Sequence, residues 1–456
     1  MFETVINNGH VIDPASKISA KLNIGIAGGK IVHISDELLA GINEIDAKGR
    51  IVSPGFIDIH IHEDEYNESK DECTLENSNA LLKMGVTTAI AGNCGIPTGC
   101  DDPVKYLEVV DRIRFPINLA MLSPQYSLRK AVGIVDEYQT ASKEEISTMA
   151  NVLEDHLKHG CYGVSMGIEY MPGTSSEEIE AMMKVASRFG CVTAIHMRDG
   201  AKKSISSLYE MIKAAELENA TLQISHIGSM CGYGQMERAL AIIDASRAKG
   251  LNISFDCYPY AAYCTDIGSA AFDDGFMEGY ELSDDGYFRL EVAIGKYAGT
   301  RCTKELFMKL RESEPNTLLI GHLMNENEVD MALSHPACII GSDVDFINGQ
   351  GHPRGIGTFP RFISEHVKNK KLLSIEQALE KMTFLPAQRY GLPKGTLKVG
   401  SDADITIFDL NKIKDQATYQ NPLREPEGID LVLMGGKVAL RQSAIVNGKL
   451  GKTIRK

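Results

Sequence analysis

The stretch GFIDIHIHEDE, residues 55–65, runs from an apolar segment into two histidines, His60 and His62, and then into a cluster of carboxylates. Residues two apart in a β-strand point to the same face, so the two imidazoles would lie side by side at the end of a buried strand. The stretch therefore predicts either a metal site at a strand end or two ordinary histidines on one strand face. The remainder of the chain has to distinguish these alternatives.

Apolar runs of this kind recur along the chain and alternate with amphipathic, helix-length segments such as residues 75–85 and 142–160. Eight alternating β and α units predict a TIM barrel, that is, a (β/α)8 barrel. An open doubly wound sheet is the alternative, but the chain has neither a GxGxxG motif before a helix nor a P-loop. The eight expected strands are Phe56–His62, Val86–Gly92, Ile117–Leu122, Tyr162–Met166, Val192–His196, Thr221–Ser225, Asn252–Cys257 and Cys338–Ser342.

Both ends of the chain differ in pattern from this central region. They consist of short β runs separated by Asn-Gly, Gly-Gly and Lys-Gly pairs, which are typical of hairpins. Within the central region, the long interval from Tyr260 to Ala337 contains more than one helical segment and the extra apolar run TLLIGHLM. We interpret that interval as an insertion over the mouth of the predicted barrel.

The composition disfavours several classes of partner. The chain has 456 residues with a formal net charge of −14 and no basic block, so nothing favours nucleic acid or an anionic membrane as a partner. It begins without a basic and apolar signal sequence, and no stretch approaches the roughly 20 apolar residues that span a bilayer. Its 10 cysteines include no CxxC pair. Thiols in an acidic chain are typical of the reducing cytoplasm, which is the location we expect.

Metal-binding side chains occur where five of the predicted strands end. The carboxyl ends of the strands of a (β/α)8 barrel meet on one face, where the active sites of this fold lie. Zinc accepts imidazole, thiolate and carboxylate together, with one position left open for water in a catalytic site. Their occurrence at five strand ends favours a metal site over ordinary histidines. The candidate ligands are His60, His62, Cys94, His196, His226 and Asp343.

Short motifs around these residues resemble those of the N-acyl-D-amino-acid deacylases, or D-aminoacylases, of the amidohydrolase superfamily. In chain order they are HIH, GNCG, HMRD, SHIG, DCYPY, and GSDVD followed by HPRGIGTFPR. The C-terminal stretch MTFLPAQRYGLPKGTLKVGSDADITIFD agrees with the same family. HxH alone is typical of the whole superfamily, whereas GNCG together with HPRGIGTFPR is specific to this branch. The resemblance extends over nearly the whole chain and is weakest in the interval before Ala337.

The resemblance implies a domain organisation. A metal-dependent barrel, residues 56–396 with an insertion around 263–337, would be carried by a small β-sandwich. Both chain ends, residues 1–55 and 397–456, would form that sandwich.

The resemblance also implies a zinc scheme. Related hydantoinase-like enzymes bridge two metals with a carboxylated lysine from the fourth strand, but the predicted fourth strand here offers no lysine. Cys94 occupies the position where D-aminoacylases use a thiolate. The implied ligands are Cys94, His196 and His226 for one tightly bound zinc ion, and His60 and His62, with Asp343 close by, for a weaker second site.

The implied activity is hydrolysis of a carbon–nitrogen amide bond, in the simplest case the deacylation of an N-acyl-D-amino acid. Zinc would polarise the carbonyl and lower the pKa of water, and Asp343 would take the proton from that water and pass it to the leaving amine. Arg354 matches the arginine that binds a substrate carboxylate in the family, and Tyr258 matches a tyrosine that assists it. Arg198 is expected at the rim as a further substrate contact. The predicted partner is therefore a small molecule with an amide and a carboxylate.

Two positions depart from the family pattern. Gly228 stands where D-aminoacylases often have a lysine, and Cys264 stands where they often have a serine. Both changes remove expected carboxylate contacts, and a charged hydrogen bond is worth about 1.5–3 kcal/mol. A cyclic amidase resembling dihydroorotase or hydantoinase, or a dipeptidase, is thus the alternative activity, and a non-catalytic scaffold is a remote one. The sequence leaves the oligomeric state open.

Overall fold

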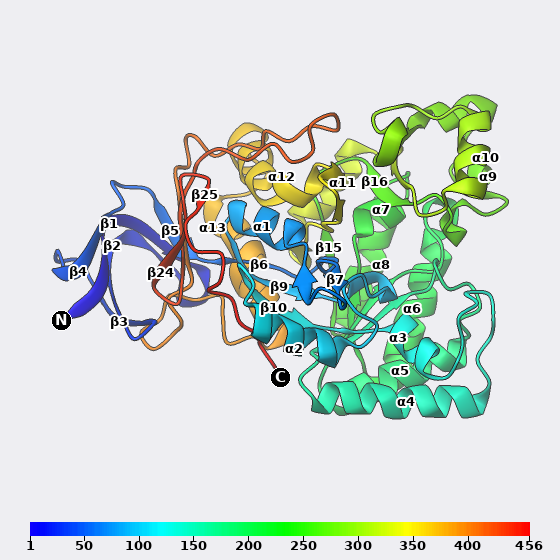
Figure 1. Ribbon diagram of the computed structural model, residues 1–456, viewed down its shortest axis with the longest axis horizontal. Coiled ribbons are helices and arrows are strands. Elements are labelled where there is room, and N and C mark those ends of the chain that lie inside the picture. Colours follow the sequence, from blue (N-terminus) through cyan, green and yellow to red (C-terminus); the bar gives the residue numbers. More distant parts are fainter.

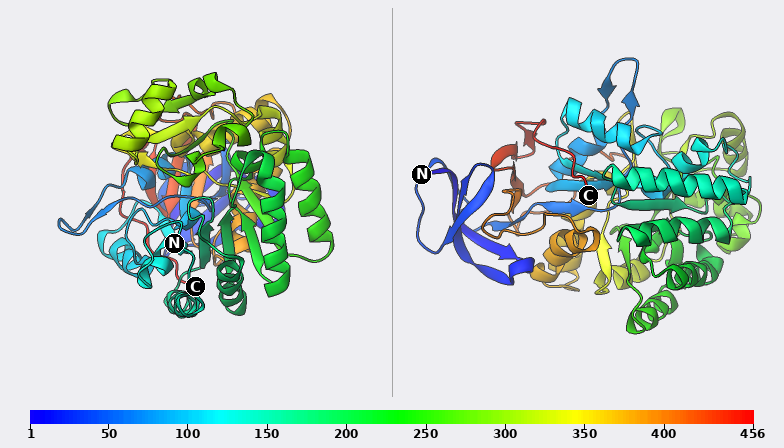
Figure 2. Two further views of the ribbon diagram at one scale, coloured as in Figure 1. Left: turned by 90° about the vertical axis from the view of Figure 1, so that its right-hand side faces the viewer. Right: turned by 90° about the horizontal axis from the view of Figure 1, so that it is seen from below.

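The computed structural model of the chain describes residues 1–456, apart from the side chain of Asp284. The fold is mixed α/β. A sheet built from both ends of the chain lies at one end of the molecule, and a larger α/β part lies beside it (Figure 1). Figure 2 shows the same division from below, with the blue N-terminal strands at one end and the green helices at the other. The helices of the described part of the chain are too short or too polar to span a lipid bilayer.

One nine-stranded sheet joins the two ends of the chain. Its order is β25-β24-β23-β22-β5-β1-β2-β3, with β4 beside β1. Strand β5 pairs with β1 on one side and with β22 on the other, so the N-terminal and C-terminal strands are continuous in hydrogen bonding. Buried side chains from both ends, among them Ile6, Val52 and Leu433, form one cluster on this sheet. The strands are β1 (Phe2–Asp13), β2 (Ile18–Ala27), β3 (Lys30–Ser35), β4 (Gly41–Asp46), β5 (Ile51–Pro54), β22 (Ile405–Phe408), β23 (Ile429–Met434), β24 (Lys437–Arg441) and β25 (Ala444–Ile445).

The Asn8-Gly9 pair does not form the hairpin turn that the sequence predicted. Strand β1 continues through it, and its register with β2 shifts at this point, which makes a β-bulge. Asn8 has a φ of 59°, and its backbone N–H donates to the side-chain oxygen of Asn23 over 2.8 Å. The Gly-Gly pair between β2 and β3 does form a hairpin. The local signal is ambiguous because a bulge and a tight turn both require residues that tolerate positive φ.

A strand overlaps each of the eight runs that the sequence predicted to be buried strands. All residues of β12 and β13 are buried, which is typical of strands in a parallel sheet. The parallel order is β10-β9-β6 in one sheet and β11-β12-β13-β14-β15-β19 in another. Beyond β6 and β19, a parallel bridge joins Ile61 to Val344. The strands are β6 (Phe56–Asp58), β9 (Val86–Ala91), β10 (Asn118–Met121), β11 (Ser123–Pro124), β12 (Gly163–Gly167), β13 (Val192–His196), β14 (Thr221–Ile224), β15 (Ile253–Cys257) and β19 (Cys338–Ile340).

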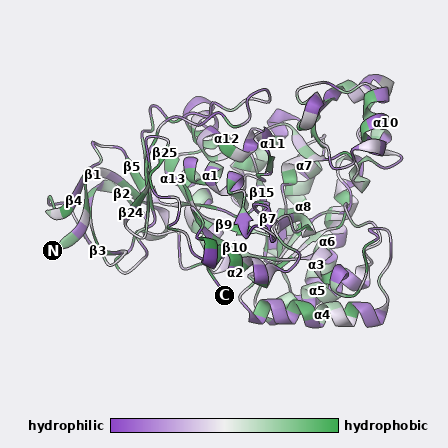
Figure 3. Cartoon of the chain, viewed as in Figure 1, coloured by the Kyte–Doolittle hydropathy of each residue, from purple (hydrophilic) through white to green (hydrophobic). Residues whose placement is uncertain are grey.

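Amphipathic helices connect these strands, and Figure 3 shows the alternation of apolar and polar residues along α4. Helix α4 begins with a capping box in which Ser142 and Glu145 exchange hydrogen bonds, and it buries Met149 and Leu153. The helices are α1 (Glu76–Lys83), α2 (Pro103–Ile113), α3 (Gln125–Ala131), α4 (Lys143–Lys158), α5 (Ser176–Arg188), α6 (Ser204–Glu218), α7 (Ile227–Cys231), α8 (Met236–Ala248), α11 (Glu326–Ser334), α12 (Arg354–Arg361), α13 (Ile375–Leu379) and α14 (Leu385–Tyr390).

The interval that we interpreted as an insertion contains a small antiparallel sheet of its own, in the order β16-β18-β17. The extra apolar run TLLIGHLM contains its middle strand. Helices α9 and α10 of this interval lie at the upper right of Figure 1. The elements are β16 (Tyr263–Asp266), α9 (Phe276–Gly279), β17 (Leu290–Val292), α10 (Lys304–Ser313) and β18 (Leu318–Gly321).

Candidate metal centre

The six predicted ligands all lie at or just beyond the carboxyl ends of parallel strands. His196 is the last residue of β13, and the others follow β6, β9, β14 and β19 within four residues. Cys94, His226 and Asp343 have positive φ values of 54°, 30° and 55°. Such a backbone is uncommon for residues other than glycine and costs on the order of 1–3 kcal/mol at each position. Three strained residues in one cluster are typical of a functional site.

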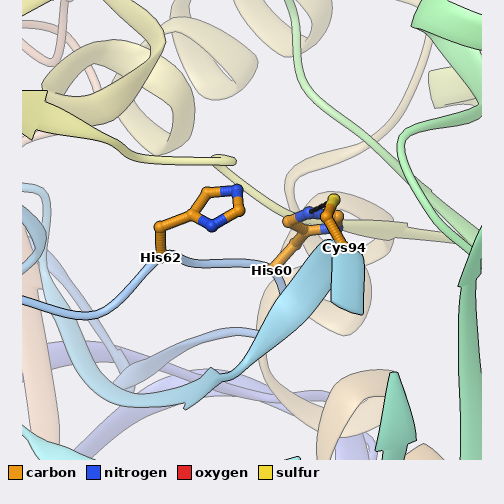
Figure 4. Close-up of side chains that lie close together, drawn as sticks. All are labelled: His60, His62 and Cys94. Atoms are coloured by element: carbon orange, nitrogen blue, oxygen red, sulfur yellow. Dashed lines mark hydrogen bonds between the residues drawn. The ribbon is translucent and has the colours of Figure 1, made fainter. Parts of the chain in front are cut away.

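The side chains of these residues meet at one point. The Cys94 Sγ atom lies 3.3 Å from Nε2 of His60 and 3.3 Å from Nε2 of His226. The Nδ1 atom of His196 lies 3.0 Å from Nε2 of His226. Figure 4 shows His60 and Cys94 in contact, with the His62 ring beside them. Three sets have ligand atoms within 4.8 Å of one another: His60, His62 and Cys94; Cys94, His196 and His226; and His60, His226 and Asp343.

The electrostatics of this cluster suit a metal cation. Burial by itself would raise the pKa of the Cys94 thiol, but the imidazoles of His60 and His226 hold that pKa well below its usual range. The buried Nδ1 atom of His62 has no hydrogen-bond partner among the described residues. A thiolate, several imidazoles and a carboxylate directed at one point form a donor set that divalent metals accept.

Two carboxylates that the sequence analysis missed, Asp256 and Glu169, contact the rings of the candidate ligand histidines. Oδ1 of Asp256 lies 3.1 Å from Nδ1 of His60 and accepts the backbone N–H of His226 over 2.8 Å. Oε2 of Glu169 lies 2.7 Å from Nε2 of His196. Such partners orient a ligating imidazole and fix which nitrogen carries the proton. Asp256 could have been found as the acidic residue of the DCYPY motif, whereas Glu169 lies in a loop and has no comparable signal.

Replacement of Glu169 by glutamine is expected to lower the metal affinity, and with it the activity at limiting metal, by about 10- to 100-fold. The amide keeps the length of the side chain but removes the negative charge beside His196. Metal titration of the variant by competition with a chelator measures the effect. Glu177→Gln, at an exposed position at the start of α5, is the matched control. Equal metal affinities of the two variants would contradict a positioning role for Glu169.

Asp343 lies between the histidines and Arg354. Its Oδ1 is 3.5 Å from Nε2 of His60 and 3.3 Å from Nε2 of His62, and its Oδ2 is 2.9 Å from Nη1 of Arg354. Burial opposes ionisation, yet the Arg354 guanidinium and the neighbouring imidazoles hold the pKa of Asp343 well below its usual range. The guanidinium packs over the ring of Tyr258 at 4.7 Å, and the Tyr258 hydroxyl has no partner among the described residues.

Arg198 lies apart from this cluster. Its Nε and Nη2 atoms donate to the carboxylate of Glu210 over 3.0 Å and 2.8 Å, and Nη2 also donates to the carbonyl of Thr174 over 3.0 Å. The guanidinium therefore ties helix α6 to the loop before α5. The fork of the side chain is thus engaged by the protein itself, and a role of Arg198 as a substrate contact stays a prediction.

A cavity of about 390 Å³ opens onto the ligand cluster. His62, Cys94 and His226 line it together with Asp343 and Arg354. Residues from β16 and from the loops of the insertion line it as well. Its volume lies in the range of small-molecule sites. Fold and site together define a class of protein: a mixed α/β protein whose cavity ends on a set of metal ligands.

Comparison with known proteins identifies the family. The Amidohydrolase family matches residues 43–279 and 288–440, and the chain belongs to that family. An N-acyl-D-glutamate deacylase of Alcaligenes xylosoxydans xylosoxydans is 29% identical over 97% of this chain and 94% of its own. A D-aminoacylase of the same organism is 28% identical over 99% of this chain and 97% of its own.

A solved structure is similar over the whole chain. It is the N-acyl-D-glutamate deacylase from Bordetella bronchiseptica, complexed with zinc and a phosphonate inhibitor that mimics the tetrahedral intermediate of the reaction. Its TM-score with this chain is 0.87 at 26% identity, and the alignment covers 100% of both chains. The family resemblance that the motifs indicated is confirmed, and the donor set together with this similarity supports a divalent metal in the site.

Proposed function

We propose that this protein hydrolyses the amide bond of an N-acyl-D-amino acid, or a related N-acyl compound, in a zinc-dependent reaction. The observation that carries the proposal is the convergence of Cys94, the histidines and Asp343, with Cys94, His62, His226 and Asp343 lining one cavity. The relatives named above are deacylases of this type. Nitrogen and sulfur donors of this kind favour zinc among the divalent metals.

The proposed tight zinc site consists of Cys94, His196 and His226, and the weaker site of His60 and His62 with Asp343 close by. A zinc ion bound there would polarise the amide carbonyl and lower the pKa of a water molecule that it binds. Asp256 and Glu169 would keep the imidazoles oriented. Burial of the site, with Cys94 3% exposed and His196 4% exposed, would keep bulk water away from the reacting atoms.

Asp343 is the proposed general base and general acid. Its carboxylate is held ionised by Arg354 and can accept the proton of the attacking water. The same proton would then pass to the nitrogen as the carbon–nitrogen bond breaks, so that a free amine and a carboxylic acid result. Arg354 would hold Asp343 in place through Nη1 and through Nε, which donates to the Asp343 carbonyl over 2.7 Å. Its Nη2, whose contact with the Cys264 carbonyl is long at 3.5 Å, would bind the substrate carboxylate, and the free hydroxyl of Tyr258 would assist it.

We further propose that the parallel strands close into a (β/α)8 barrel. Support comes from the direct succession of β10 and β11 and from the bridge of Ile61 with Val344, which link the two parallel sheets at both sides. The shared nine-stranded sheet supports a β-sandwich domain from both chain ends. The proposed boundaries are residues 1–55 and 397–456 for the sandwich and residues 56–396 for the barrel, with the insertion around 263–337.

A ring-opening cyclic amidase is the second candidate, and the surroundings of Gly228 favour it. A Cβ atom at this position would lie 3.0 Å from Sγ of Cys257 and 3.0 Å from Cε of Met324. A lysine therefore does not fit there without movement of its neighbours. The site therefore lacks the lysine cation that would bind a substrate carboxylate, and the binding of a cyclic amide depends less on such a cation.

The first experiment measures the metal content of the purified protein by elemental analysis and assays N-acetyl-D-amino acids beside their L-enantiomers, a dihydropyrimidine, a hydantoin and dipeptides. We expect about one or more zinc ions per chain and turnover of the D-enantiomers. Full zinc occupancy with ring opening and no deacylation would replace the proposal by the second candidate. A protein that binds no transition metal would contradict both.

A further inference from the structure

Part of the lining of the cavity is acidic. Asp266, the last residue of β16, Asp345, two residues beyond Asp343, and Glu137, before α4, all line it. Among the residues that the structure describes, no lysine, arginine or histidine forms an ion pair with any of these three carboxylates. The guanidinium of Arg354 also lines the cavity, but Asp343 is its ion-pair partner. These three carboxylates thus line the cavity without an ion-pair partner from the protein.

Two of these carboxylates are close enough to influence each other. Burial, and then the charge of Asp345, raises the pKa of Asp266 to about 6. Asp266 therefore loses solvation without gaining an ion-pair partner from the protein. A cation in the cavity would give these carboxylates the favourable charge interaction that the folded protein does not provide.

The insertion brings one of these groups to the site. Strand β16 pairs with β18, so that Asp266 lies opposite Leu318, and the next residue, Ile267, donates its N–H to the carbonyl of Thr317 over 2.9 Å. Thr265, next to Asp266, donates its hydroxyl to that of Tyr170 over 3.2 Å. These bonds fix the position of the strand, and with it the position of Asp266 in the lining of the cavity.

The remaining lining also suits a cation. The rings of Tyr126, Tyr138 and Tyr170 contribute to the same cavity, and aromatic faces attract ammonium and guanidinium groups. An acidic side chain would meet three uncompensated carboxylates here, which is unfavourable at short range. These carboxylates and rings therefore favour a cationic over an acidic substrate side chain.

We propose that the substrate carries a positive charge beyond the scissile amide, namely that it is an N-α-acyl-D-amino acid with an amino or guanidino side chain whose cation lies against Asp266 and Asp345. This inference rests on the proposed deacylase function and adds a substrate class to it. Glu137, at the exposed mouth of the cavity, would attract the same cation at longer range.

The test compares kcat/KM of the zinc-loaded enzyme for N-α-acetyl-D-lysine and for N-acetyl-D-norleucine, which has a side chain of similar length without the charge. N-acetyl-D-glutamate is the third substrate. We expect the lysine-to-norleucine ratio to exceed about tenfold, as a charge-assisted hydrogen bond provides, and the glutamate compound to be the poorest. Asp266→Asn is expected to lower the ratio by at least about fivefold. Asp274→Asn removes the same charge from an exposed position of the insertion and should keep the ratio.

The outcomes separate this inference from the function on which it rests. Turnover of the norleucine compound with no preference for lysine would overturn the inference and leave the deacylase function intact. A lysine preference that survives both Asp266→Asn and Glu137→Gln would overturn the assignment of the acidic wall; the second variant, at an exposed site, keeps the test valid where the first fails to fold. Absence of turnover for all three substrates by zinc-loaded enzyme would overturn the deacylase function and this inference with it.

Discussion

Replacing Cys94 by alanine is expected to remove about one metal ion per chain and to lower kcat/KM by more than the roughly 10- to 100-fold that loss of an outer partner of a metal ligand causes. The reason is geometric. The Sγ atom lies between the imidazoles of His60 and His226 and belongs to two of the three sets of converging ligand atoms. Cys94 is held in this position by the strained turn after β9, where it has positive φ.

Elemental analysis and the assay on the same preparation measure this effect. Cys161→Ala is the matched control, because Cys161 is fully buried and far from the cluster along the chain. Both variants lose a small buried thiol, so a common effect on folding would appear in both. Retention of the metal and of the activity by the Cys94 variant would show that the thiolate is not a ligand.

Replacing Asp343 by asparagine is expected to lower kcat by about 100- to 10,000-fold, the usual contribution of a positioned acid or base, while the metal at Cys94 is retained. The amide oxygen can still accept a hydrogen bond from Arg354, but the amide has no basic oxygen for the proton of water. The two predictions are therefore distinguishable: the Cys94 variant loses metal and activity together, and the Asp343 variant loses activity alone.

The control for this variant has to account for stability. Asp343 and Arg354 are a buried pair, with side chains 7% and 4% exposed, and breaking such a pair can cost about 3–5 kcal/mol. Glu178→Gln removes the carboxylate from another buried pair, with Arg129, whose Nη2 lies 2.9 Å from Oε2. We expect similar losses in Tm for the two variants and a large loss in kcat for the Asp343 variant alone. A kcat within tenfold of the wild type for that variant would exclude Asp343 as the acid and base.

The two proposals make the cavity a site with two charged regions. At its base a metal centre and Arg354 would take the amide and the carboxylate of a substrate. At its wall the carboxylates of Asp266 and Asp345 would take a cation. Asp345 shares the loop after β19 with Asp343, but Asp266 comes from β16, so a change in β16 could alter substrate choice without loss of the chemistry at Asp343.

The strands of the α/β part and the ligand candidates at their ends could be predicted from the sequence. Both follow from local rules: a strand buried on two faces reads as a continuous apolar run, and the polar residue that follows lies at the carboxyl end of a parallel sheet. His196 illustrates this, since it ends both the apolar run and strand β13. The Asn8-Gly9 pair shows the limit, because one local signal serves two backbone conformations.

Such local rules could not predict contacts between segments that lie far apart in the sequence. Glu169 meets His196 across 27 positions, Asp256 meets His60 across 196, and Asp266 reaches the cavity from β16, which belongs to neither parallel sheet. The sequence placed Arg198 near the ligands by its position after β13, but its guanidinium donates hydrogen bonds to Glu210 on α6. Composition and periodicity specify which face of each element is buried, whereas packing in three dimensions selects which polar groups from separate elements become partners.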